Sequence, residues 1–401
     1  MQRIGLRPSM GLLVLLQNSS QSILKMKEMS KNLVSNIKTF NPLNVSSKFA
    51  ICGLPIRIDS YKTCSFGCKY CFAENRKIME YDKHIQIGNV RQVKQKLHRI
   101  FDERTVDATK LLDVLIADGI TWHCGGMSDP FQPCEQKYHI TEQIVDIANE
   151  YNVSILFSTK SNCLYGADVK PDLHTFQLSV SNVDDRRDIE PNVPSIAERY
   201  RFFCDLKNAG FRVGIRIQPF IPNVSTLKIV EMFKDADQFT IEGVKIVPQN
   251  KECKDFILEH LGLNRCDFTQ MGLLNLKPEI RLQFYKPFID YFKQNDIPYS
   301  IADNDLRWIG NNKCCCGDGL VKKSTNFNTT RMIMDYGIDY DKKQLDEELG
   351  CSGCGDCKCN NLFTSNRQEG CITVSDFYGK RFERKSSPFS PKFQYVSETI
   401  S

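Results

Sequence analysis

The sequence has no long apolar run and no strong excess of charge of either sign. No segment approaches the roughly 20 consecutive apolar residues that a membrane-spanning helix needs. The apolar stretch Met10–Gln17 is short, and the small-residue cleavage site of a secretory signal does not follow it. We therefore expect a cytoplasmic protein without a membrane partner.

Charge and composition exclude further classes. The 53 basic and 48 acidic residues leave a net charge of +5, which permits an anionic ligand or nucleic acid but favours neither. Internal repeats and low-complexity tracts are also lacking. With 41% hydrophobic and 25% charged residues in 401, the chain can bury a large core, so a disordered or fibrous protein is excluded.

Cysteine, by contrast, is abundant, with 18 residues in the chain. Disulfide-rich secreted proteins are normally short chains without a sufficient core, and this chain is neither short nor poor in core residues. In a reducing compartment, crowded thiols are typical of metal binding and above all of iron–sulfur ligation.

From about residue 50, short apolar runs alternate with segments of helical periodicity, which predicts parallel strands joined by right-handed helical crossovers. The expected fold is α/β, a partial (β/α)6 barrel of the TIM type, with a small Cys-rich C-terminal appendage. We expect an arm, helical or mobile, over 1–45, the barrel over 46–310 and a metal-binding region over 311–401. The predicted strands are AICGLPIRI, GITWHCGG, VSILFSTK, TFQLSVS, FRVGIRIQPFI, GVKIVPQ and YSIAD, and the predicted helices are NVRQVKQKLHRIF, TEQIVDIANEY, PSIAERYRFFCDLKNAG and PEIRLQFYKPFIDYFKQND.

Cys64, Cys68 and Cys71 follow the first of these strands, spaced as C-x3-C-x2-C. A four-iron cluster has four corner irons, and three thiolates from one loop leave one corner open. Catalytic metal sites keep such an open position, whereas structural sites close it. A zinc site with a distant fourth ligand is the alternative, although zinc loops usually contain C-x2-C pairs. The spacing favours an iron–sulfur cluster.

The stretch CSFGCKYCF resembles the cysteine signature of radical S-adenosylmethionine enzymes, C-x3-C-x-aromatic-C. The resemblance implies a [4Fe-4S] cluster whose open iron is chelated by S-adenosylmethionine. It also implies reductive cleavage of S-adenosylmethionine to a 5′-deoxyadenosyl radical, which abstracts hydrogen from a substrate. Such an enzyme needs an electron donor such as flavodoxin or ferredoxin.

Further segments resemble the branch that includes spore photoproduct lyase. These are GGMSDPFQPCE at 125–135, FSTKS at 157–161 and the stretch from LSVSNVDDRRDIEP to GIRIQPFIP. By position, the resemblance implies that Ser128, Asp129, Lys160 and Ser179 bind the cofactor, with Ser181 as an alternative to Ser179. Glu190 and Gln218 are weaker candidates of the same kind. Asp129 before Pro130 has a second interpretation, that it only shapes its loop.

One position departs from that branch. The lyase that repairs thymine dimers is expected to carry a hydrogen-donating cysteine two residues before the serine matched by Ser128, and this chain has Gly126 there. Cys124 and Cys134 are the candidate catalytic surrogates. The alternative is that both are buried thiols that pack as small apolar side chains. Dimer repair is therefore not established by the resemblance.

The C-terminal region carries a second group of thiols. Its segment GCSGCGDCKCN provides the candidate metal ligands Cys351, Cys354, Cys357 and Cys359, and NNKCCCGDGL provides residues 314–316. The spacing resembles ferredoxin ligand runs and predicts a second iron–sulfur cluster, with zinc as the alternative. The basic run 380–393 permits phosphate contacts or a solvated tail.

Three functions follow as hypotheses. The first is a radical enzyme acting on nucleic acid, as a spore photoproduct lyase does. The second is a radical enzyme that modifies a peptide or small metabolite with the help of an auxiliary cluster. The third is a non-catalytic, zinc-stabilised nucleic-acid-binding protein.

Overall fold

The computed structural model describes residues 37–46, 52–73, 85–107, 111–247, 251–269, 273–303, 306, 309–312, 315–317, 319–324, 381–385 and 392–396. The predicted ligands Cys351, Cys354, Cys357 and Cys359 lie outside these residues, as does Cys314. The predicted second cluster therefore stays a prediction.

A sheet of eight strands forms the centre of the fold. Its order is β12-β9-β8-β7-β6-β5-β3-β2, so successive strands of the chain are neighbours in space. All neighbours pair in parallel except β2 and β3. The strands are β2 (Leu43–Val45), β3 (Ile56–Ile58), β5 (Trp122–Cys124), β6 (Ile155–Thr159), β7 (Thr175–Ser179), β8 (Val213–Phe220), β9 (Gln238–Gly243) and β12 (Tyr299–Ile301).

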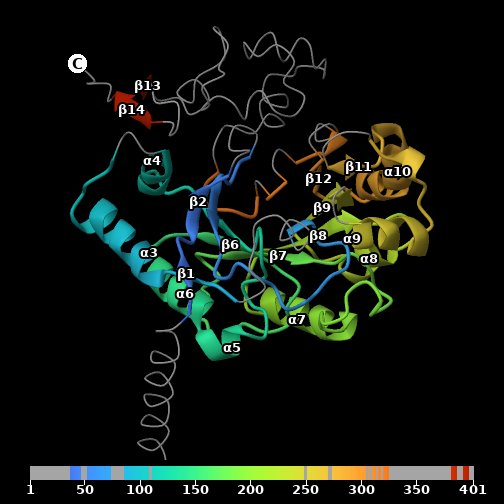
Figure 1. Cartoon of the computed structure of the whole chain (residues 1–401), viewed down its shortest axis with the longest axis horizontal. Coiled ribbons are helices and arrows are strands. Elements are labelled where there is room, and N and C mark those ends of the chain that lie inside the picture. Colours follow the sequence, from blue (N-terminus) through green and yellow to red (C-terminus); the bar gives the residue numbers. More distant parts are fainter. Residues whose placement is uncertain are drawn as a thin grey trace, which may run out of the picture.

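Helices connect these strands and lie around the sheet (Figure 1). The longer ones are α3 (Val90–Leu97), α4 (Leu111–Ala117), α6 (Ile140–Glu150), α7 (Ile196–Asn208) and α10 (Pro278–Gln294). Short ones are α5 (Glu135–Tyr138), α8 (Lys228–Met232) and α9 (Lys251–Asp255), with single turns at His98–Asp102, Phe256–His260 and Arg265–Asp267. Helix α7 begins with a capping box of Ser195 and Glu198, which satisfies two backbone donors at the helix start.

Three small pairs of strands complete the described structure. Strands β1 (Thr39–Phe40) and β4 (Ile87–Gly88) are parallel, β10 (Lys245–Ile246) and β11 (Leu274–Asn275) are antiparallel, and β13 (Arg381–Lys385) and β14 (Lys392–Val396) are antiparallel.

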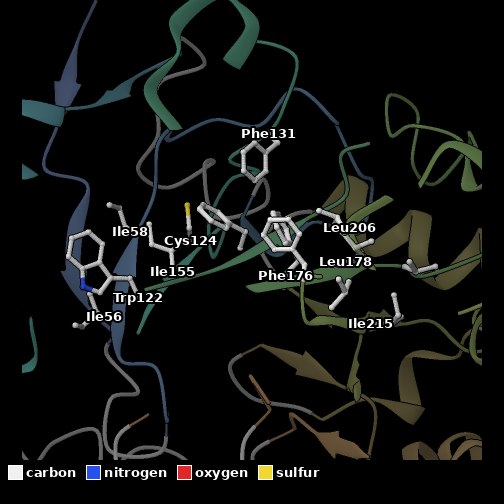
Figure 2. Close-up of a cluster of buried hydrophobic side chains, with 14 of the residues drawn as sticks. Ile56, Ile58, Trp122, Cys124, Phe131, Ile155, Phe176, Leu178, Leu206 and Ile215 are labelled. Carbon is white, nitrogen blue, oxygen red and sulfur yellow. The ribbon is translucent and has the colours of Figure 1, made fainter. Parts of the chain in front are cut away.

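The two faces of the central sheet differ in chemistry because side chains alternate along each strand. The apolar face packs against the helices, and Figure 2 shows Trp122, Ile155, Phe176 and Leu206 within this layer. The opposite face, the polar face, is defined by Arg57, His123, Ser158, Gln177, Arg216 and Thr240, which lie on neighbouring strands.

The prediction of an α/β chain with a parallel sheet is confirmed. Four predicted helices correspond to α3, α6, α7 and α10. The predicted strand in GVKIVPQ corresponds to the last residue of β9, Gly243, and to the short strand β10, which pairs with β11 outside the sheet. The strand of the central sheet in this region is β9. Its polar and apolar residues alternate, so its sequence lacks the continuous apolar run from which a buried strand would be predicted.

Residues on both sides of the expected domain boundaries contact the central sheet. Leu43–Val45, at the end of the expected arm, pairs with β3. The Cys315 carbonyl accepts hydrogen bonds from Gln177 (3.0 Å) and Thr240 (2.9 Å) on the polar face. The segment that contains Cys315 thus packs against the polar face of the sheet.

Among the described residues, no helix is both long and apolar enough to cross a membrane.

His174 is expected to make the fold sensitive to acid. Its Nδ1 accepts from the Ile155 backbone N–H (3.2 Å), and its Nε2–H donates to Asn149 Oδ1 (3.0 Å). Burial lowers the pKa of His174 from 6.5 to about 4. Below about pH 6.5 the unfolded chain binds a proton that the folded chain does not, so stability falls as the pH falls towards 4.

We expect His174→Asn, which keeps an acceptor for Ile155, to reduce this loss by about 2–3 kcal/mol between about pH 7 and about pH 4.5. Urea unfolding of both chains at the two pH values measures it. An equal loss in the two chains would show that His174 does not cause it.

Candidate functional site

The loop with Cys64, Cys68 and Cys71 follows β3 at the carboxyl end of the sheet. Gln132 braces one side of it, since its amide accepts from the Ser65 N–H (2.8 Å) and donates to the Thr63 carbonyl (2.8 Å). Asn192 braces the other side by donating to the Ser65 carbonyl (3.0 Å). The loop conformation is therefore fixed by side chains from two separate parts of the chain.

The three thiols of this loop lie within electrostatic reach of one another. Cys68 is buried, whereas Cys64 and Cys71 are half-buried. Burial and, to a smaller extent, the nearby Asp129 carboxylate raise the pKa of Cys64 to about 12. Burial also raises the pKa of Cys68, which Lys160 opposes. A metal ion or a cluster would supply the positive charge that thiolates need at this site.

In the part of the chain that is described, no group of three or more His, Cys, Asp or Glu side chains already has the arrangement of a metal site. For the three cysteines of the loop to bind a metal, their side chains would therefore have to rotate. The loop backbone itself is already held by Gln132 and Asn192.

Asp129 joins its own loop to the end of β6. One carboxylate oxygen accepts from the Thr159 hydroxyl (2.7 Å) and the Phe131 N–H (3.0 Å), and the other from the Lys160 N–H (2.7 Å). Gly125 lets this loop approach β6, because a Cβ there would lie 2.1 Å from the Ser158 carbonyl oxygen. Both oxygens of Asp129 are thus occupied by protein groups, which favours the interpretation that it shapes the loop.

Lys160 places a positive charge beside the cysteine loop. It follows β6 and is half-exposed, and its ammonium lies 5.7 Å from the centre of the Tyr70 ring. Its charge also acts on Cys68. Among the predicted cofactor residues, Lys160 is the one that combines a charge, partial exposure and proximity to the cysteines.

Tyr70, inside the cysteine loop, connects to a buried polar group. Its hydroxyl donates to Glu190, and it accepts from the Ser181 hydroxyl at 3.4 Å. Glu190 also pairs with Arg199 at 3.5 Å, and Arg199 donates to the Ser179 carbonyl (3.1 Å). The structure therefore brings Ser179, Ser181 and Glu190 together next to the cysteine loop.

The remaining predicted residues lie at different depths. Ser128 is buried and donates to the Tyr61 carbonyl (2.6 Å), which holds the start of the cysteine loop. Gln218 is half-buried and accepts from Arg216 on the polar face.

The two candidate catalytic cysteines have different surroundings. Cys124 is fully buried on the apolar face, and Figure 2 shows its sulfur among apolar side chains such as Ile58 and Ile155. Cys134 is half-buried and close enough to Cys64 and Tyr61 to interact with both. A Cβ at Gly126 would instead face Arg57 Nη1 at 3.4 Å. The structure thus brings Cys134 to the cysteine loop and places Cys124 away from it.

The sequence reasoning did not single out the charged residues of the polar face. Arg57 contacts His123 Nδ1, and His123 Nε2 lies 2.7 Å from the Ser158 hydroxyl. Arg216 donates to Gln177 (3.1 Å) and pairs with Glu242 at 3.4 Å. The sequence does contain a signal for these residues: in the predicted strands, polar residues alternate with apolar ones.

Comparisons with known proteins add three findings. No family model matches the chain. The uncharacterized protein MJ0683 of Methanocaldococcus jannaschii is 25% identical over 207 residues, which cover 50% of this chain and 73% of the relative.

Two solved structures resemble the fold. Spore photoproduct lyase complexed with dinucleoside spore photoproduct has a TM-score of 0.46 and 14% identity, covering 62% of this chain and 76% of that one. SuiB of Streptococcus suis bound to S-adenosylmethionine has a TM-score of 0.38 and 12% identity, covering 74% of this chain and 56% of that one.

Proposed function

We propose that this protein is a radical S-adenosylmethionine enzyme built on a partial (β/α)6 barrel, of the group that includes spore photoproduct lyase. One observation carries the proposal: a braced loop with three cysteines follows the first parallel strand, and the Lys160 charge lies beside Cys68. The sequential order of the parallel strands supports the barrel, because a doubly wound sheet would reverse its strand order instead.

Cys64, Cys68 and Cys71 fit a [4Fe-4S] cluster with one open iron. They are three thiols on one braced loop, so together they provide three of the four ligands that a cubane cluster takes. When bound, the cluster and S-adenosylmethionine together supply a 5′-deoxyadenosyl radical that can remove a hydrogen atom from a substrate. The protein's own tasks are binding, orientation and exclusion of water.

Several residues can perform those tasks. The Lys160 ammonium can pair with the carboxylate of S-adenosylmethionine. Lys160 directly follows β6 and its side chain is half-exposed, so it is accessible to a ligand at that end of the strand. Ser179 and Ser181 can hydrogen-bond polar groups of the same ligand. Asp129 acts as a positioning residue, because it fixes the Lys160 backbone at 2.7 Å. The polar face below them provides the wall of a substrate site.

Two substrate classes are compatible with the proposed site: nucleic acid, and a peptide or small metabolite. Dimer repair as in the lyase needs a hydrogen-donating thiol, and Gly126 cannot provide one. Cys134 is the thiol that lies beside the cysteine loop, so we propose it as the donor if the substrate radical is quenched by the protein. Ultraviolet-irradiated DNA incubated anaerobically with the reduced enzyme, followed by mass analysis, tests repair; unchanged photoproduct would exclude it.

Electron paramagnetic resonance of the reconstituted, reduced protein tests the open iron directly. Chelation by S-adenosylmethionine changes the ligands of one iron, so the spectrum should shift when S-adenosylmethionine is added. The same addition should leave the spectrum of a cluster with four protein ligands unchanged. Protein that takes up zinc and no iron would support the non-catalytic zinc-binding alternative instead.

Lys160→Met is expected to weaken S-adenosylmethionine binding by about 10- to 100-fold, since a charge-assisted hydrogen bond contributes roughly 1.5–3 kcal/mol. Equilibrium dialysis of the reconstituted protein measures the dissociation constant. The matched control is Lys286→Met, because Lys286 is 72% exposed on α10 and lies outside the proposed site. Equal affinities of the Lys160 and Lys286 variants would remove Lys160 from the binding site.

A further inference from the structure

Arg216, Glu242 and Lys245 form a group, here called the charged group, beside the polar face of the sheet. One carboxylate oxygen of Glu242, on β9, pairs with Arg216 on β8 at 3.4 Å. The other oxygen pairs with Lys245, the first residue of β10. The Lys245 side chain is 20% exposed, and those of Arg216 and Glu242 are 11% and 10% exposed. The group is therefore sheltered but still within reach of a small ligand.

The charged group carries more positive than negative charge. Burial raises the pKa of Glu242, but the charges of Lys245 and Arg216 outweigh burial and hold this pKa below its usual value. The carboxylate is therefore ionised at neutral pH. Asp303, whose charge also acts on Lys245, is itself paired with Arg281 at 2.9 Å. Among the described residues, two cations and one carboxylate thus leave one positive charge in a sheltered place, which is costly unless an anion offsets it.

The two cations of the charged group also have hydrogen-bond donors to spare. A guanidinium has five N–H groups, and an ammonium has three. Arg216 Nε–H donates to Gln218, and its two terminal nitrogens donate to Gln177 (3.1 Å) and Glu242 (3.4 Å). Lys245 donates to Glu242. Within the described part of the chain, each cation therefore keeps N–H groups for water or a ligand, and sheltered donors favour an acceptor.

The charged group lies beside the proposed radical site. Arg216 is the partner of Ser179 in the register of β7 and β8, and Ser179 is a proposed cofactor residue. The two neighbours of Lys245 in the chain pack in one apolar cluster with Cys68 of the cysteine loop. A ligand held by the charged group would therefore extend towards the place where the radical is proposed to form.

The charged group is nevertheless separate from Lys160. Lys160 follows β6, which is two strands from β8 and three from β9. At the usual strand spacing, about 10–14 Å along the sheet separate Lys160 from those strands. S-Adenosylmethionine has one carboxylate, which Lys160 binds in the proposed site. A second place for an anion at this distance therefore suits the substrate.

We propose that Arg216 and Lys245 bind an oxyanion group of the substrate, a phosphate or a carboxylate, beside the radical site. The planar N–H groups of an arginine match two oxygens of either anion, and a lysine adds a point charge. Glu242 holds the two cations together, and its own charge limits the site to a single anionic group. That the ligand is a substrate rests on the proposed function, whereas the anion site itself does not.

Isothermal titration calorimetry of the full chain with inorganic phosphate and, separately, with acetate tests the site. Wild type should bind at least one of them saturably, and the tighter one identifies the oxyanion. Lys245→Gln should weaken this binding by about 10- to 100-fold, the usual effect of removing a charge-assisted hydrogen bond. The matched control is Lys286→Gln, which removes the same charge from an exposed position on α10 and should bind as wild type does.

Three results of this experiment would overturn the proposal. The first is a wild type that binds neither anion saturably. The second is equal affinity of the Lys245 and Lys286 variants. The third is displacement of the bound anion by S-adenosylmethionine, because the site would then belong to the carboxylate of the cofactor.

Hydrogen exchange of wild type keeps the proposal testable if Lys245→Gln does not fold. Phosphate or acetate, compared with chloride at the same ionic strength, should slow amide exchange in peptides that cover 213–220 and 238–247. Unchanged exchange in both peptides would overturn the site. Neither measurement depends on release of 5′-deoxyadenosine, so this site and the proposed radical chemistry can fail independently.

Discussion

Cys68→Ala is expected to lose the cluster of the proposed radical site, about four iron atoms per chain. Cys68 is the buried member of the three, and a missing thiolate there leaves two ligands on a loop that cannot shift, because Gln132 and Asn192 hold it. Iron analysis and visible absorption after anaerobic reconstitution measure the loss. Cleavage of S-adenosylmethionine should fall to the background rate.

The matched control is Cys266→Ala, because Cys266 is an exposed cysteine in a separate single turn of helix. This variant should keep the iron content and the absorption of wild type. If Cys68→Ala retained all its iron, the three cysteines could not be the cluster ligands. Iron bound elsewhere in the chain would then explain the reconstituted colour.

Asp129→Ala is expected to destabilise the fold by about 3–5 kcal/mol, because it leaves three donors without their acceptor in a buried place. The donors are the Thr159 hydroxyl and the N–H groups of Phe131 and Lys160. S-Adenosylmethionine binding should weaken as well, since Lys160 is no longer positioned. Urea unfolding and equilibrium dialysis measure the two effects.

Asp129→Asn removes the negative charge of this side chain but keeps its size and shape. Its amide oxygen can keep the Thr159 and Phe131 bonds, but its NH₂ group meets the Lys160 N–H, so an intermediate loss of stability is expected. A direct cofactor ligand would show a different pattern, with wild-type stability in both variants and a loss of affinity alone. That pattern would contradict the positioning role.

Much of the helical structure could be predicted because its signals are local. The segment that became α7 has Ser195 and Glu198 at its start and Gly210 just past its end, which are cap signals that need no tertiary contact. In α10, Pro278 stands in the first turn, where its missing N–H costs nothing. Apolar periodicity provided the rest.

Strand β9 could not be assigned from periodicity alone. Its buried polar residues Gln238, Thr240 and Glu242 read as surface positions, yet they line the polar face and find partners there. The apolar segment after it, with Val244 and Ile246, looked more like a strand. It is buried in a separate cluster with the cysteine loop.

For the candidate site, residues that are close together in the sequence could be predicted to act together. How deeply each side chain is buried could not be predicted. The spacing of Cys64, Cys68 and Cys71 indicated one loop. Whether Cys124 approaches that loop depends on which face of β5 its side chain occupies, and this strand of three residues has no polar alternation strong enough to decide it. The hydrogen bonds of Gln177 and Thr240 to the Cys315 carbonyl join distant segments, which no local pattern encodes.

Release of 5′-deoxyadenosine tests the central claim most directly. Anaerobically reconstituted wild type and the variant Cys64→Ala/Cys68→Ala/Cys71→Ala are each given dithionite and S-adenosylmethionine, and the product is quantified by mass spectrometry. The proposed function predicts release by wild type and background levels from the variant. Equal release from both, or a wild type that binds zinc at these cysteines and releases none, would contradict it.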